Sequence, residues 1–203
     1  MDKKISNIRE YDVTIPYLGD YSKGFHIREI ARKMEMNHRT VTLALNSLQR
    51  QGIVKHKTSG RNKVFFLNLD NPRTKDHIRD TESYRLGNKL NVNTVIKELY
   101  SSILSPKIPK TPIVLFGSYA KGDNDKKSDI DLLIFEKDEN VIKAAKKFEL
   151  KYDIAVHIQV ISKKKIEMTL REKEPLILEI SENHLILNNQ DAFVNILWRY
   201  YSE

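Results

Sequence analysis

Cysteine is absent from the sequence, which excludes disulfide bonds and thiolate metal sites. Long apolar runs are absent too, and no stretch approaches the roughly 20 apolar residues that a membrane-spanning helix needs. The sequence opens with Met-Asp-Lys-Lys, which lacks the apolar core of a secretion signal. We therefore expect a cytoplasmic protein without a membrane partner.

The composition that remains is that of a globular protein with excess positive charge. Hydrophobic residues make up 40% of the 203 positions and charged residues 31%, enough for one large or two small domains. The net charge of +8 is uneven, because residues 1–70 hold 13 basic and 7 acidic residues, whereas residues 71–203 hold 22 and 20. Such a local excess is typical of nucleic-acid binding. We expect the first third of the chain to contact nucleic acid.

Residues 26–67 have the pattern of two helices followed by a hairpin. Apolar residues recur at helical spacing in two segments, at Ile27, Ile30, Ala31 and Met34 and then at Val41, Leu45 and Leu48. Asn37 is placed to cap the second helix, and Gly52 to end it. Two short segments follow, Ile53-Val-Lys-His-Lys57 and Lys63-Val-Phe-Phe-Leu67, separated by a Ser-Gly turn. The pattern predicts a helix-turn-helix with a two-stranded wing.

This region resembles the winged-helix repressors of the MarR and ArsR types, over about residues 20–70. The resemblance implies that the second helix enters the major groove of double-stranded DNA and that the wing contacts phosphates or the minor groove. The candidate DNA-contacting residues are Asn37, His38, Arg39, Thr42, Asn46 and Arg50 on the helix and Lys55, Lys57, Arg61 and Lys63 on the wing. The alternative is a winged helix that only contacts protein, with the charges as a solvated face.

Asp70-Asn71-Pro72 marks a boundary, because proline does not easily continue a strand. Residues 73–90 are almost entirely polar and predict a connecting helix. Apolar residues in 91–104 then fall on one helical face behind Asn93, a possible cap. The predicted organisation is a winged helix in residues 1–70, a connecting helix or linker in 71–90 and a second domain in 91–203.

Residues 112–136 carry the most informative pattern in the chain. The apolar run Ile113–Phe116 is closed by Gly117-Ser118, which predicts a buried strand leading into a helix. The start of a helix has unpaired N–H groups and suits a phosphate. Further along, Asp129 and Asp131 are two apart on a predicted strand, so they point to the same face. Two such carboxylates favour a cation, and Mg²⁺ prefers oxygen ligands of this kind.

Together, Gly117-Ser118, Lys121-Gly122 and Ser128-Asp129-Ile130-Asp131 resemble the signature of minimal nucleotidyltransferases of the DNA polymerase beta superfamily, over roughly residues 95–200. The resemblance implies transfer of a nucleoside monophosphate (NMP) from an NTP, with Mg²⁺ or Mn²⁺ as cofactor. Asp129 and Asp131 would bind the metal and carry catalysis, and Gly117, Ser118, Lys121 and Ser128 would bind the nucleotide. The alternative is a hairpin whose acids are only solvated.

Catalytic members of this family usually carry a third acidic residue on a neighbouring strand. Residues 152–162 alternate between apolar and polar and predict that strand. We place the third position at Gln159, an amide that cannot act as a base. His157, two residues away, is the other candidate, and its alternative is a histidine that only forms a hydrogen-bonded wall. Losing a general base typically lowers the rate by about 10²- to 10⁴-fold, so transfer is less certain to survive than nucleotide binding.

The fold class expected is α+β in two domains, a winged helix-turn-helix followed by a small mixed-sheet nucleotidyltransferase-like α/β domain. The first functional hypothesis is a DNA-binding, regulatory protein that binds Mg-NTP and transfers NMP to an acceptor. The alternatives are an antitoxin-like enzyme that modifies a small helical partner protein, and a repressor with a degenerate transferase domain. Winged-helix repressors are usually two-fold dimers, so we expect a homodimer.

Overall fold

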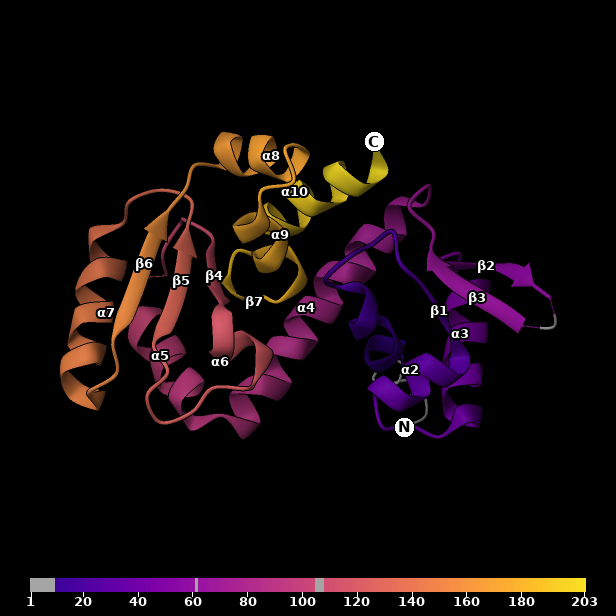
Figure 1. Cartoon of the computed structure of the whole chain (residues 1–203), viewed down its shortest axis with the longest axis horizontal. Coiled ribbons are helices and arrows are strands. Elements are labelled where there is room, and N and C mark those ends of the chain that lie inside the picture. Colours follow the sequence, from indigo (N-terminus) through magenta and orange to yellow (C-terminus); the bar gives the residue numbers. More distant parts are fainter. Residues whose placement is uncertain (1–9, 61, 105–107) are drawn as a thin grey trace. The chain divides into compact units, whose positions relative to one another are not determined.

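The structure, a computed structural model, describes residues 10–60, 62–104 and 108–203. The chain divides into two compact units. Unit 1 comprises Met1–Tyr84 together with Leu197–Glu203, and unit 2 comprises Arg85–Ile196. The mixed α+β character expected from the sequence is confirmed (Figure 1).

Unit 1 is built from short helices and one small sheet. Its elements are the 3-10 turn η1 (Ile15–Tyr17), β1 (Gly24–His26), α2 (Ile27–Lys33), α3 (His38–Arg50), β2 (Val54–Ser59) and β3 (Asn62–Leu67). The sheet is antiparallel in the order β1-β3-β2. The sequence predicted a hairpin of two strands and missed β1. Gly24 makes the third strand possible, since a Cβ there would collide with the side chains of Phe66 and Val64.

The two helices of unit 1 form as their sequence pattern predicts. Val41, Leu45 and Leu48 of α3 are completely buried, and so is Ile30 of α2. Asn37 caps α3, because its side-chain oxygen accepts a hydrogen bond of 2.8 Å from the Thr40 N–H. The cap and the buried face together fix where α3 begins and which side of it stays outside.

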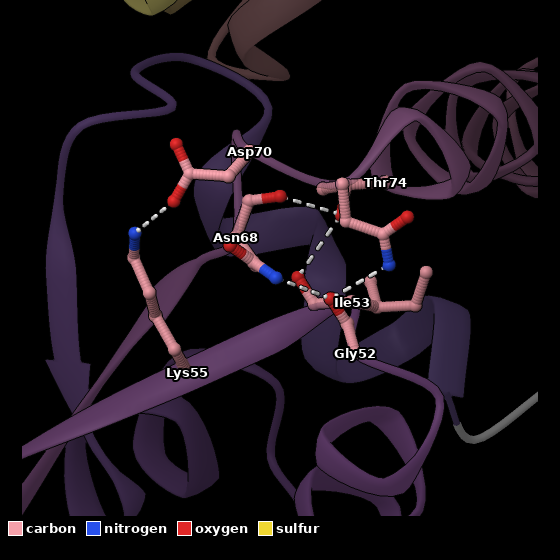
Figure 2. Close-up of polar contacts among 7 residues, drawn as sticks. Gly52, Ile53, Lys55, Asn68, Asp70 and Thr74 are labelled. Atoms are coloured by element: carbon pink, nitrogen blue, oxygen red, sulfur yellow. Dashed lines mark hydrogen bonds and ion pairs between the residues drawn. The ribbon is translucent and has the colours of Figure 1, made fainter.

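Side-chain hydrogen bonds tie the end of the hairpin to the next helix (Figure 2). Asn68 donates to the Gly52 carbonyl at 2.9 Å, and the Thr74 hydroxyl donates to the Asn68 carbonyl at 2.8 Å. Lys55 of β2 pairs with Asp70 at 3.0 Å. Helix α4 (Pro72–Val92) then takes up the segment predicted as a connector, and the division between the two units falls inside it, after Tyr84.

Unit 2 contains a four-stranded mixed sheet with helices between its strands. Its elements after α4 are α5 (Thr94–Leu104), β4 (Ile113–Phe116), α6 (Gly117–Lys121), β5 (Ile130–Ile134), α7 (Glu139–Tyr152), β6 (Val156–Val160), α8 (Lys163–Arg171), α9 (Pro175–Glu182), β7 (Leu185–Asn188) and the first part of α10 (Gln190–Ser202), whose residues from Leu197 on belong to unit 1. The strand order is β6-β5-β4-β7, in which β5 and β6 are parallel and the other pairs antiparallel. All four residues of β4 are buried.

One face of this sheet forms the core with α5 and α7 (Figure 1). Ile130, Leu132 and Ile134 of β5 point into that core and are completely buried, as the alternation of the sequence predicts. Strand β6 is shorter than expected and begins at Val156. Asp153, at φ 53°, ends α7 in the left-handed conformation instead of extending the strand. Within the described ranges, no helix has both the length and the apolar character required to cross a bilayer.

Candidate active site

The register of β4 and β5 brings the two halves of the motif together. Phe116, the last residue of β4, lies opposite Asp131 of β5, so the Gly117-Ser118 turn lies beside the carboxylates. Gly117 has φ +70°, and a Cβ built on it would lie 2.5 Å from Oδ2 of Asp131. Only glycine fits both this backbone conformation and this close approach. The Asp131 carboxylate therefore sits directly over the start of α6.

Asp131 is half-buried, whereas Asp129, which precedes β5, is exposed. Partial burial raises the pKa of Asp131, His157 opposes the rise, and the charges of Asp129 and Glu179 add to it. A partly buried carboxylate with other negative charges near it is typical of a cation-binding site.

On the neighbouring strand, His157 lies nearer to the carboxylates than Gln159 does. In the parallel register of β5 and β6, His157 lies beside Asp131 and Gln159 lies beside Leu133. The Nε2 atom of His157 is 3.3 Å from Oδ2 of Asp129. Of the two residues predicted as candidates for the third position, His157 is therefore level with Asp131, and Gln159 lies two residues further along the strand; the exact register cannot be read from alternation alone.

Two of the predicted nucleotide contacts have partners within the protein. Ser128 accepts a hydrogen bond from the Asp125 N–H at 2.8 Å and donates to the Asp125 carboxylate at 3.1 Å, so it shapes the loop before β5. Lys121, the last residue of α6, donates to Oε1 of Glu179 on α9 at 2.6 Å. Glu179 was missed from the sequence, because 58 residues separate it from Lys121 and no local pattern marks it.

Lys89 is a second residue that the sequence reasoning missed. Its Nζ lies 3.0 Å from the position that a Cβ on Gly122 would take, just after α6. Burial lowers the pKa of Lys89, and the nearby Arg85 lowers it further. It was overlooked because segment 73–90 was interpreted only as a connector.

The donor set fits a divalent cation that arrives with a nucleotide. Among the residues that the structure describes, no group of three or more His, Cys, Asp or Glu side chains is arranged to hold a metal. Two carboxylates are, however, what Mg²⁺ commonly takes from a protein when substrate phosphates supply further oxygen ligands. Asp129 and Asp131 could supply those two carboxylates, and the Asp131 carboxylate lies against Gly117 where no Cβ intervenes.

In unit 1, α3 and the hairpin carry the residues predicted to contact DNA. His38, Arg39, Asn46 and Arg50 are exposed on α3, as are Lys55, Lys57 and Lys63 on the hairpin. Arg61 lies outside the described residues. Leu43, which is 60% exposed on α3, is an apolar member of this surface that the sequence reasoning missed.

Several of these side chains have internal roles as well. The Asn37 side chain is engaged in the cap of α3, and the Thr42 hydroxyl donates to the His38 carbonyl one turn earlier at 2.8 Å. Lys55 is paired with Asp70. The Nζ atom of Lys57 lies over the Phe66 ring, 5.6 Å from its centroid. Arg39, Asn46, Arg50 and Lys63 are therefore the stronger candidates for contacts outside the protein.

Comparison with known proteins shows which family unit 2 resembles. Residues 96–188 match the family described as "Nucleotidyltransferase domain". A Methanocaldococcus jannaschii protein that bears the name "Putative protein adenylyltransferase" is 41% identical over 83 residues, covering 36% of this chain and 81% of the relative. The chain belongs to the nucleotidyltransferase family. No solved structure matches it.

The family match spans β4 to β7, so the carboxylates, the Gly117-Ser118 turn and His157 all lie inside it. Helices α2 and α3 and the hairpin lie outside it. Membership of the family implies an NTP substrate and usually a divalent metal, in agreement with the resemblance noted from the sequence.

Proposed function

We propose that this protein transfers AMP from ATP to a hydroxyl group of an acceptor protein. The observation that carries the proposal is the register that lays Gly117 against Asp131, with Asp129 and His157 alongside. The relative named for protein adenylyltransferase activity supports ATP as the donor and a protein as the acceptor. A small helical partner protein, as in the antitoxin-like hypothesis, is one acceptor of this class.

In this proposal Asp129 and Asp131 hold Mg²⁺ or Mn²⁺, while Gly117, Ser118 and Lys121 bind the triphosphate. When bound between these carboxylates, the cation would neutralise phosphate charge. With Nε2 of His157 donating to Asp129, its Nδ1 carries a lone pair and accepts the proton of the acceptor hydroxyl. The hydroxyl oxygen then bonds to the α-phosphorus, the bond to the bridging oxygen breaks, and pyrophosphate leaves with that electron pair.

The test is labelling with each of the four NTPs carrying the label at the α-phosphate. The purified protein is incubated with Mg²⁺ or Mn²⁺ and lysate from its own source. We expect ATP to label a protein, and Asp129→Ala to abolish the label. Asp123→Asn removes an exposed acid from the preceding loop and is the matched control. Labelling that persists in Asp129→Ala would contradict the proposed site, and label on RNA or a small molecule would contradict a protein acceptor.

A second activity is favoured by a separate observation in unit 1. We propose that α2, α3 and the hairpin form a winged helix that binds double-stranded DNA through the exposed face of α3. Two observations support this proposal. Helix α3 has an N-terminal cap and one buried face, with Arg39, Asn46 and Arg50 on its exposed face, and a basic hairpin follows it. The homodimer and a role in transcription regulation belong to this proposal and remain predictions. Fluorescence anisotropy with labelled duplex DNA tests it, and affinity that does not change with salt would contradict it.

A further inference from the structure

The ion pair between Lys121 and Glu179 is not used by the reaction proposed above. It joins the last residue of α6 to the middle of α9 through an Nζ to Oε1 contact of 2.6 Å. Both side chains are accessible, with 35% of Lys121 and 48% of Glu179 exposed. A bound molecule can therefore reach either partner.

The pair lies at the proposed triphosphate site. Lys121 follows Gly117 by four residues, so the two lie on the same side of α6 one turn apart. Gly117 in turn lies against Asp131. The charge of Glu179 is one of the influences that raise the pKa of Asp131, so this carboxylate acts on the site electrostatically. The lysine that resembles a phosphate ligand is thus bound to a protein carboxylate near the metal-binding pair.

We propose that Glu179 occupies Lys121 when no nucleotide is bound and that the triphosphate displaces it, so Glu179 sets nucleotide affinity by competing for Lys121. This inference rests on the proposed function and adds a positioning residue to it. A solvent-accessible ion pair contributes little stability, and the lysine stem is flexible, so the exchange has a low cost. A triphosphate carries more negative charge than one carboxylate and wins the competition.

The competition predicts a particular pattern of coupling between the two residues. Removing the charge of Glu179 frees Lys121 and strengthens nucleotide binding, whereas removing Lys121 weakens it. Once Lys121 is absent, Glu179 has nothing left to compete for. The effect of changing Glu179 therefore disappears in the Lys121→Ala background, and the two substitutions are not additive.

The experiment is calorimetric titration of Mg-ATP, and separately of inorganic tripolyphosphate, into five proteins. These are the wild type, Glu179→Gln, Lys121→Ala, the double variant and Glu139→Gln. Glu139 is the matched control, because it forms a similar exposed pair with Lys137 at 2.8 Å on another part of unit 2. We expect Glu179→Gln to lower the Kd about two- to fivefold, the range that an exposed ion pair supports. In the labelling assay it should lower KM for ATP without raising kcat.

The other outcomes separate the possible failures. If Glu179→Gln binds Mg-ATP like the wild type, the ion pair does not compete with nucleotide and the inference is overturned, while the proposed function stands. If the substitution strengthens binding equally in the Lys121→Ala background, Glu179 acts by simple repulsion and the competition is again overturned. If the folded wild type binds neither ligand, the proposed function fails and the inference falls with it. Thermal melts of all five proteins confirm that each is folded.

Discussion

Gly117 determines, at the scale of a single residue, whether Asp131 can lie over the start of α6. Its φ of +70° would strain the backbone of any residue with a side chain. In addition, a Cβ built on Gly117 would lie only 2.5 Å from Oδ2 of Asp131 and would collide with it. We predict that Gly117→Ala destabilises the protein by about 1–3 kcal/mol and abolishes Mg-ATP binding. Thermal unfolding and calorimetric titration measure the two effects.

Gly60 offers a matched control for that substitution. It has a similar φ of +60°, but among the described residues, its chain neighbours aside, no atom lies within 4 Å of a Cβ built on it. Gly60→Ala should therefore suffer only the backbone strain and leave Mg-ATP binding unchanged. Equal losses of stability in both variants, with nucleotide binding retained in Gly117→Ala, would show that Asp131 does not depend on this contact.

His157 is the second residue, and the register decides its position. Because it lies beside Asp131 and contacts Asp129, we predict that His157→Ala lowers the transfer rate by about 10²- to 10⁴-fold, the usual contribution of a general base. Gln159→Ala, two residues further along the same strand, should change the rate far less. The rate of label transfer measures both, and a larger loss in Gln159→Ala would return the third position to Gln159.

At the scale of an element, α3 presents one buried and one exposed face, and the exposed face carries the proposed DNA contacts. We predict that Arg39→Ala combined with Arg50→Ala weakens duplex DNA binding and reduces the slope of log K against log salt by about 2, since two phosphate-neutralising charges are lost. Lys143→Ala with Lys146→Ala on the exposed side of α7 removes the same charge elsewhere and should leave the slope intact. An unchanged slope in the arginine variant would exclude α3 from the interface.

At the scale of the whole molecule, the end of the chain belongs to unit 1 rather than to the nucleotidyltransferase unit that precedes it. Tyr201 donates to the Gly19 carbonyl at 3.4 Å, and its ring lies 5.2 Å from that of Tyr21, which is almost completely buried. Such a contact stabilises the segment before β1, although the two tyrosines are far apart in sequence.

We predict that Tyr201→Ala increases amide hydrogen exchange in residues 17–25 and leaves β4 and β5 protected, because the lost packing belongs to unit 1 alone. Ser202→Ala, an exposed neighbour, is the control. Exchange that rises in β4 and β5 instead, or nowhere, would contradict the assignment of this segment to unit 1.

The sequence by itself determined the parts of this protein that depend on short-range chemistry. The Asn37 cap, the buried face of α3, the all-buried β4 and the glycine turn that follows it are all set by neighbours within about one turn of helix or one strand. The alternation around Asp129 and Asp131 was equally readable, because successive residues of a strand point to opposite faces. The family itself was indicated by the resemblance of the motif in residues 117–131 to minimal nucleotidyltransferases, and the family match agrees with it.

Only the tertiary structure decided the features that depend on pairing between distant segments. Alternation along β6 puts His157 and Gln159 on the same face and does not say which of them lies beside Asp131. The register of the backbone hydrogen bonds between β5 and β6 places His157 there. Glu179 reaches Lys121, and Tyr201 reaches Tyr21, across intervals that carry no periodic signal. The physical reason is that such contacts follow from how whole elements pack, and no stretch of sequence encodes them locally.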